Sequence, residues 1–221
     1  DEFRMSDYAT RRTAMVDTQI RPSDVTKFPI IEAMLTVPRE AFVPMDMREA
    51  AYMGKNLDMR DGRVLLEPRT LAKMLDALDI QKNELVLDVA AGLGYSSAVV
   101  ARMAEAVISV EDSEARVDEA QTILSEHNVD NVVMQAGPLG EGAAEHGPYD
   151  VILVQGGVEE LPNSLLDQLK DGGRIACVRM SGALGDVQIG HKLDGEITWR
   201  SIFNAGAPVL SDFVRARAFA L

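Results

Sequence analysis

Residues 85–96 read Leu85-Val86-Leu87-Asp88-Val89-Ala90-Ala91-Gly92-Leu93-Gly94-Tyr95-Ser96, and this stretch decides the fold of the 221-residue chain. An apolar run typical of a buried strand passes into a turn of small residues, and a helix is expected to follow. Gly92 and Gly94 let the backbone pass close to a ligand, because a side chain there would block the approach. The start of the following helix offers free N–H groups to an anionic group such as a carboxylate. The stretch therefore predicts a ligand-binding turn between a strand and a helix.

Two acidic residues indicate which ligand this turn binds. Asp88 ends the first strand and Glu111 ends the second, where an acidic side chain can accept both ribose hydroxyls of a nucleoside. A dinucleotide fingerprint requires a third glycine at the position of Ser97. Asp88 is placed to meet the positively charged amino acid end of S-adenosylmethionine, directly or through water, and so favours that cofactor. A nicotinamide dinucleotide, or a turn that binds no ligand, is the alternative.

From residue 84 onward the hydrophobic pattern alternates between strand and helix. Strands are expected at 85–87, 107–110, 132–134, 151–154 and 174–178, and helices at 98–106, 114–127 and 161–169. Farther on the pattern predicts strands alone, at 187–193, 197–203 and 213–219. This order predicts an α/β fold of the Rossmann-like type, with a mostly parallel sheet, an antiparallel C-terminal edge and helices on both faces.

The chain ahead of this region is expected to be an accessory segment. Residues 1–80 are expected to form helices and loops that pack on a core of residues 81–221, giving one compact domain. Residues 30–35 carry an apolar helical face, and Pro38 is expected to end that helix. Thr70 is expected to cap a second helix, whose apolar residues recur at helical spacing.

The composition narrows the class of protein. Apolar residues make up 47% of the chain, which suffices for a buried core, and the formal net charge is −13. That charge argues against nucleic acid as a partner, because a phosphate backbone attracts clustered lysine and arginine. Cys177 lies in an apolar run and is expected to be an inert strand residue, and the three histidines lack metal-ligand spacing. No apolar stretch could span a membrane and no signal peptide is visible, so a soluble, cytoplasmic protein is expected.

Several segments carry a family resemblance. The most specific is Val37-Pro38-Arg39-Glu40-Ala41-Phe42-Val43-Pro44. The others are Ala33-Met34, Ala51-Tyr52, residues 88–95, residues 149–152, Leu161-Pro162 and residues 166–173. Together they resemble the protein-L-isoaspartate O-methyltransferase family over residues 15–210. The resemblance implies S-adenosylmethionine as the cofactor, methyl transfer to a protein carboxylate, and a role in protein repair.

Two segments and one single residue depart from that family. Where the family has Thr-Ile-Ser-Gln-Pro over the transferring methyl group, this chain has Val64-Leu65-Leu66-Glu67-Pro68, so both hydroxyls are absent and an acid replaces an amide. Gly137-Pro138-Leu139 replaces a Gly-Asp-Gly whose aspartate lies near the adenine, and Ala90 replaces the first glycine of the cofactor turn. We therefore expect a usable cofactor site and an altered acceptor site. Leu66 either favours a more apolar acceptor or packs a closed, unused pocket.

The motif and the resemblance together give the expected site residues. Those expected to bind the cofactor are Asp88, Ala90, Gly92, Gly94, Tyr95, Ser96, Glu111, Asp112, Gly137, Pro138, Leu139 and Gln155. Leu66 and Glu67 are expected on the substrate side. An ionised carboxylate attacks a sulfonium methyl in line without a general base, so no catalytic acid or base is expected. The acceptor is a protein or peptide carboxylate or a small molecule, and a non-catalytic S-adenosylmethionine-binding module is the alternative.

Overall fold

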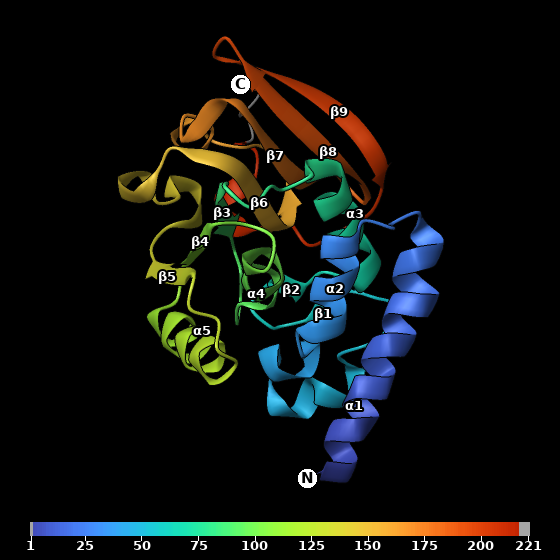
Figure 1. Cartoon of the computed structure of the whole chain (residues 1–221). Helices are drawn as coiled ribbons and strands as arrows, with labels where there is room; N and C mark the ends of the chain where they lie inside the picture. The colour runs from blue at the N-terminus through green and yellow to red at the C-terminus, as the bar shows by residue number, and fades with distance from the viewer. Residues whose placement is uncertain (1, 217–221) are drawn as a thin grey trace.

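The structure is a computed structural model that describes residues 2–216, and its centre is one sheet of seven strands in the order β5-β4-β3-β6-β7-β8-β9 (Figure 1). The strands are β3 (Leu85–Val89), β4 (Ala106–Glu111), β5 (Val132–Ala136), β6 (Tyr149–Val158), β7 (Leu169–Ser181), β8 (Leu184–Leu193) and β9 (Glu196–Asn204). The first five pair in parallel, and β8 and β9 pair antiparallel at one edge. The predicted fold class is therefore confirmed. The chain order reverses between β3 and β6, the kind of switch point at which ligands bind in open α/β sheets.

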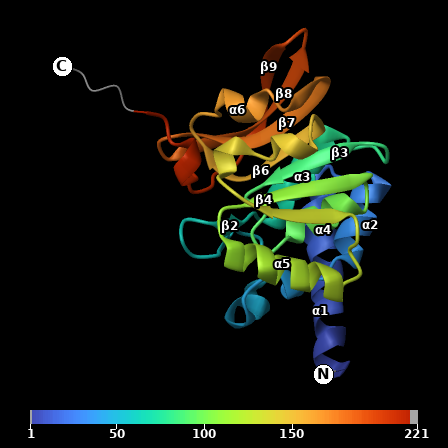
Figure 2. The same ribbon diagram turned by 90° about the vertical axis from the view of Figure 1, so that its left-hand side faces the viewer.

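The helices lie mainly on one side of the sheet. They are α1 (Glu2–Met15), α2 (Phe28–Thr36), α3 (Pro68–Leu78), α4 (Tyr95–Ala101), α5 (Glu114–Glu126) and α6 (Asn163–Leu166). Figure 2 shows the short α6 on the opposite side of the sheet from α4 and α5. Besides α6, only single 3₁₀ turns and irregular chain cover that second face within the described residues. The prediction of helices on both faces thus holds only in outline.

The sheet divides the core into two hydrophobic clusters. Successive residues of a strand point to opposite faces. Val86 accordingly joins the cluster under α2, α3, α4 and α5, whereas Leu87 joins the cluster under α6. Cys177 is fully buried in the second cluster, and burial raises the pKa of its thiol to about 12. Cys177 is therefore a buried strand residue, as predicted.

Two helices begin where backbone geometry allows rather than where we predicted. Helix α4 begins at Tyr95, not at residue 98, because Gly94 adopts a φ of 97° and lets the helix follow the turn directly. Helix α3 begins at Pro68, whose ring suits the first helical turn, so Thr70 lies inside the helix. Its hydroxyl donates a hydrogen bond to the Glu67 carboxylate at 2.8 Å instead of capping the helix.

Two predictions after β6 were wrong. The helix expected over 161–169 is only the four residues of α6, because the chain has already turned extended at Leu169 to pair with Tyr149. The strand expected over 213–219 is not formed in its described part, where a 3₁₀ turn covers Ser211–Phe213 and no strand follows. Residues 217–219 of that prediction lie outside the described residues.

The N-terminal segment ends in a short hairpin beside the glycine turn. Strands β1 (Leu57–Asp58) and β2 (Val64–Leu65) pair antiparallel and form a separate two-stranded sheet. This hairpin was not predicted, because only helices and loops were expected over residues 1–80. No helix within residues 2–216 is long and apolar enough to cross a lipid bilayer.

The end of β6 packs tightly on the C-terminal segment. The Gly157 amide donates to Pro208 O at 2.8 Å, and the Leu210 amide donates to Gly157 O at 2.9 Å. A Cβ at Gly157 would lie 2.5 Å from Ala207 O, which is backbone and cannot move aside cheaply.

We therefore expect Gly157→Ala to lower the free energy of unfolding by about 1–3 kcal/mol, as overpacking does. The control is Gly206→Ala, since the nearest atom to a Cβ there is Met180 Cε at 3.9 Å. Urea unfolding midpoints of the two variants and the wild type measure the difference. Equal midpoints for both variants would show that the contact yields.

Candidate functional site

The carboxylate of Asp88 is the most deeply buried charge at the end of β3. It has no exposed surface, and three side chains donate to it: Ser96 at 2.6 Å, Ser97 at 2.7 Å and Gln155 at 2.9 Å. Ser97 also shares a 2.6 Å hydrogen bond with Ser109 of β4. Burial raises the pKa of Asp88, and the hydrogen bonds from the serines and from Gln155 work against that rise. The first turn of α4, β4 and β6 are thereby tied to β3.

An irregularity in β6 brings Gln155 to this cluster. Pairing of β6 with β3 ends at Val154, opposite Val89. Pairing of β6 with β7 shifts register between Leu153 and Gly157. Gln155 lies in that irregular stretch, and its amide reaches back across the switch point to Asp88.

The carboxylate of Glu111 is the second buried acid and accepts four hydrogen bonds. One oxygen accepts from Arg63 and from the Gly92 amide at 2.7 Å. The other accepts from the Asp112 amide at 3.0 Å and from Arg116 at 3.1 Å. Burial raises the pKa of Glu111, and the guanidinium of Arg63 opposes this rise. Glu111 thus joins the glycine turn, α5 and the β1–β2 hairpin at one point.

The glycine turn itself contains a residue in an unfavourable conformation. Ala90 has a φ of 66° and is nearly buried, and its amide donates to Val110 O at 3.0 Å. Gly92 has a φ of 61°, and a Cβ there would meet no atom within 4 Å. The left-handed region is costly for alanine but accessible to glycine. The backbone at position 90 therefore favours the glycine that the family has there.

Residues 64–68, the acceptor segment, are held by a residue from earlier in the chain. Arg39 is fully buried and donates to Ala51 O at 2.6 Å and to Leu66 O at 2.8 Å. The Leu66 side chain is 1% exposed and belongs to the main hydrophobic cluster, whereas Glu67 is half-buried and accepts from Thr70. The side chains of this segment that line a cavity are those before Leu66.

A small cavity of about 150 Å³ separates the hairpin from the glycine turn. Arg63, Val64 and Leu65 line one side, and Ala90 and Gly92 are among the residues opposite. Sites for small molecules usually measure about 300–1,000 Å³. The cavity is therefore in the right place for a ligand of this turn but is nearly closed.

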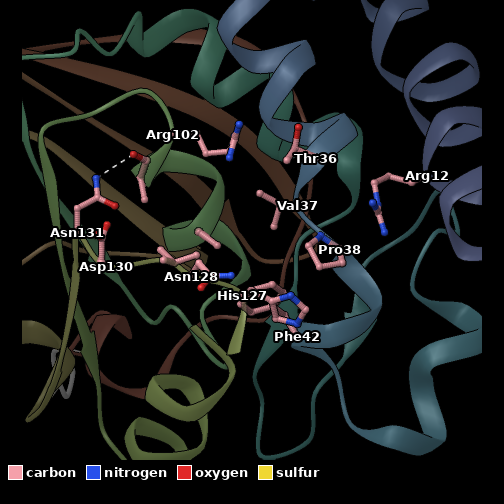
Figure 3. A pocket seen from close by; sticks show the side chains of 13 residues that line it. Arg12, Thr36, Val37, Pro38, Phe42, Arg102, His127, Asn128, Asp130 and Asn131 are labelled. Atoms are coloured by element: carbon pink, nitrogen blue, oxygen red, sulfur yellow. Dashed lines mark hydrogen bonds between the residues drawn. The ribbon is translucent and has the colours of Figure 1, made fainter. Parts of the chain in front are cut away.

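A larger cavity of about 630 Å³ shares Phe42 with the small one but is lined by no residue of the glycine turn, residues 90–95. Figure 3 shows Phe42 and the other side chains around it. The larger cavity opens between the end of α2 and the C-terminal ends of α4 and α5. Two of its polar side chains have partners: Arg12 pairs with Glu40, and Asn131 donates to Ala101 O at 2.9 Å. It does not touch Asp88 or Glu111, so size alone does not make it the functional site.

The remaining predicted residues surround the two acids at different depths. Tyr95 lines the small cavity, and the exposed Asp112 follows Glu111 and pairs with Arg116 at 3.0 Å. The Gly137 amide donates to Glu111 O at 3.0 Å, which places it beside the end of β4. Leu139 is buried in the second hydrophobic cluster, and Pro138 is exposed.

Sequence reasoning missed the two arginines at this site. Arg63 and Arg116 come from the hairpin and from α5, and no spacing in the sequence links either of them to Glu111. The role of Ser97 was recognised only as a missing glycine, although its hydroxyl is a partner of Asp88. A hydroxyl one turn into the helix after such a strand is the signal that could have revealed it.

Comparisons with known proteins agree with this geometry. A family model described as Protein-L-isoaspartate(D-aspartate) O-methyltransferase matches residues 10–201. A Protein-L-isoaspartate O-methyltransferase from Syntrophus aciditrophicus is 37% identical over 171 residues, covering 77% of this chain and 78% of the relative. One from Rhodopseudomonas palustris is 38% identical over 168 residues, covering 76% and 69%. A solved structure named Protein-L-isoaspartate O-methyltransferase matches with a TM-score of 0.79 at 25% identity, over 90% of this chain and 66% of that one.

A mostly parallel sheet with a glycine turn and a buried acid at its switch point places this chain among the Rossmann-like methyltransferases that use S-adenosylmethionine. Within that class, the family model spans most of the chain, and the two relatives are more than a third identical to it. The chain belongs to the protein-L-isoaspartate(D-aspartate) O-methyltransferase family, and the resemblance seen in the sequence is confirmed.

The strain at Ala90 gives a stability prediction. We expect Ala90→Gly to raise the free energy of unfolding by about 0.5–1 kcal/mol, because the left-handed penalty exceeds the added chain entropy of glycine. Ala14→Gly, at an exposed position inside α1, should lower it by about 1 kcal/mol. Denaturant unfolding of both variants checks the opposite signs. A loss of stability in Ala90→Gly would show that the turn is not strained.

Proposed function

We propose that this chain transfers the methyl group of S-adenosylmethionine to a carboxylate of a protein or peptide, and that its altered acceptor segment makes isoaspartyl repair weak. The observation that carries the proposal is the contact between the Gly92 amide and the Glu111 carboxylate at the ends of β3 and β4. It sets the glycine turn and a buried hydrogen-bond acceptor side by side at the edge of the sheet where this fold binds nucleosides.

The residues around the turn suit the parts of this cofactor. Glu111 would accept the ribose hydroxyls, and Gly92 and Gly94 would underlie the amino acid part. Gly137 and Pro138, beside the end of β4, would face the adenine. Asp88 is wholly enclosed, so its charge would reach the ammonium group through its hydrogen-bonded partners Ser96 and Gln155 rather than by direct contact.

Bound S-adenosylmethionine supplies an activated methyl group, so the protein has to orient the acceptor and exclude water. Val64 and Leu65 line the cavity beside the turn and provide an apolar wall. Neither offers a hydroxyl that could hold an acceptor carboxylate in line. Glu67, nearby in the chain, would repel an anionic acceptor in a site poor in water.

A non-catalytic binding module is the second candidate, and the burial of Leu66 favours it. Leu66 packs in the core, and the cavity beside its segment is small. The two candidates share the cofactor site and differ in whether any acceptor reaches it. A nicotinamide cofactor is less suited, because Ser97 is committed to Asp88 where a dinucleotide site has a glycine.

The cofactor assignment can be tested at Glu111. Glu111→Ala should weaken S-adenosylhomocysteine binding by about 1–3 kcal/mol, the contribution of a hydrogen bond to a charged acceptor. Glu119→Ala is the control, since Glu119 is an exposed acid on the rim of the same cavity. Titration calorimetry measures both affinities. Because Glu111→Ala also releases Arg63, its affinity is compared with that of Arg63→Met as well, and equal affinity in these two variants would refute the ribose assignment.

The acceptor proposal can be tested by restoring the family's polar groups. The Val64→Thr, Leu66→Ser, Glu67→Gln triple variant should methylate an isoaspartyl peptide about tenfold to a hundredfold faster than the wild type, because a positioned donor to a charged group contributes about 1.5–3 kcal/mol. Initial rates of methyl transfer measure the effect.

Its control is the double variant Val64→Thr, Glu67→Gln, which leaves the buried Leu66 intact. Truncating Leu66 in the core costs stability, so thermal unfolding of the triple variant has to show that it is folded at the assay temperature. A wild type that is already fast, with no gain in either variant, would contradict the proposal.

A further inference from the structure

Arg63 donates a hydrogen bond to Glu111, the residue proposed to accept the ribose hydroxyls. We propose that Arg63 closes the cofactor site in the free protein, and that the cofactor enters by displacing Arg63 together with the hairpin that carries it. This inference rests on the proposed function, because it concerns the same cofactor site.

The hydrogen-bonding capacity of Glu111 is the first reason. A carboxylate has about four lone-pair sites. All four are taken, by Arg63, Arg116 and the amides of Gly92 and Asp112. A ribose diol can therefore bond to Glu111 only if one of these donors leaves.

How firmly the surrounding structure holds each of the four donors decides which one leaves. The two amides belong to the glycine turn and to the end of β4. Arg116 belongs to α5, whose first turn is capped by Ser113. Arg63 directly precedes β2 in a hairpin whose two strands have two residues each. The Met59 amide donates across this hairpin to Arg63 O at 2.9 Å. Short elements with few backbone hydrogen bonds open at the lowest free energy.

The cavity gives the second, independent reason. Its volume of about 150 Å³ falls below that of ordinary ligand sites. Arg60, Asp61 and Arg63 of the hairpin form one wall. Movement of this wall enlarges the cavity and releases Glu111 at the same time, so a single motion meets both requirements.

The same motion would reach the acceptor segment. Arg63 directly precedes Val64 and Leu65, which line the cavity, and the Glu67 amide is held by Asn56 at 2.9 Å on the other side of the hairpin. Cofactor entry thus shifts the residues that face the acceptor, and the acceptor site is complete only after the cofactor has bound.

Titration calorimetry with S-adenosylhomocysteine tests the gate in three variants. Arg63→Met keeps the length of the side chain and removes its charge, and it should bind the ligand roughly tenfold more tightly than the wild type if the open form is ~10% populated. The affinity of Arg63→Lys should lie between the affinities of Arg63→Met and the wild type. Arg116→Met removes the other guanidinium from Glu111 and its 3.4 Å contact with the exposed Asp61 of the hairpin, but it leaves Arg63 on Glu111, and it should bind no more tightly than the wild type.

Each outcome has a separate meaning. Tighter binding in Arg63→Met alone, or binding only in that variant, supports the gate. Unchanged or weaker binding in Arg63→Met, with a wild type that binds, overturns the gate and leaves the proposed function standing. If neither protein binds the ligand, the cofactor site itself is wrong and the gate falls with it.

Hydrogen exchange in the wild type tests the gate without a substitution. Saturating S-adenosylhomocysteine should speed exchange in residues 59–67, because the hairpin loses its anchor on Glu111. The change should be smaller in Arg63→Met, where the anchor is already gone. Exchange in this segment that stays the same or slows in the saturated wild type would contradict displacement.

Discussion

The arrangement of this protein's ligand site depends on the compensation of one buried charge. Asp88 has no exposed surface, and an isolated carboxylate in such a place would be very costly. Three neutral donors make it tolerable, and they arrive from two parts of the fold: Ser96 and Ser97 from the first turn of α4, and Gln155 from the irregular stretch of β6. Satisfying Asp88 therefore fixes where the glycine turn leaves β3 and how β6 lies beside it.

The N-terminal segment is tied to this site by a second buried charge. Arg39 bonds the carbonyls of Ala51 and Leu66 and stacks over the ring of Tyr95 at 4.8 Å. Burial lowers the pKa of Arg39, and the neighbouring Tyr95 opposes that change. Arg39 lies within the segment 37–44 that most specifically marks the family. Its contacts give that segment a physical role, because they hold Leu66 of the acceptor segment near Tyr95, the first residue of α4.

Sequence reasoning succeeded where a local pattern carries the information and failed where distant segments meet. The strands, the helix after β4 and the antiparallel edge follow from hydrophobic periodicity, and the expected ligand turn is where the pattern of residues 85–96 put it. The start of α4 depended on the left-handed Gly94, which periodicity does not register. The pairing of Arg63 with Glu111 joins residues from separate elements, and the burial of Leu66 in the core is a tertiary contact that a local pattern does not encode.

The two buried acids differ in the kind of group that compensates them, and this difference separates scaffold from site. Asp88 is satisfied by hydroxyl and amide groups held within the core, so nothing outside the core is needed to keep it stable. Glu111 is satisfied partly by two guanidinium groups, and one of them belongs to a small surface hairpin. A buried carboxylate that lost such a partner would be left uncompensated unless another donor replaced it. A ribose hydroxyl is a donor of the required kind, so the proposed exchange of Arg63 for a bound nucleoside would keep Glu111 hydrogen-bonded in both states.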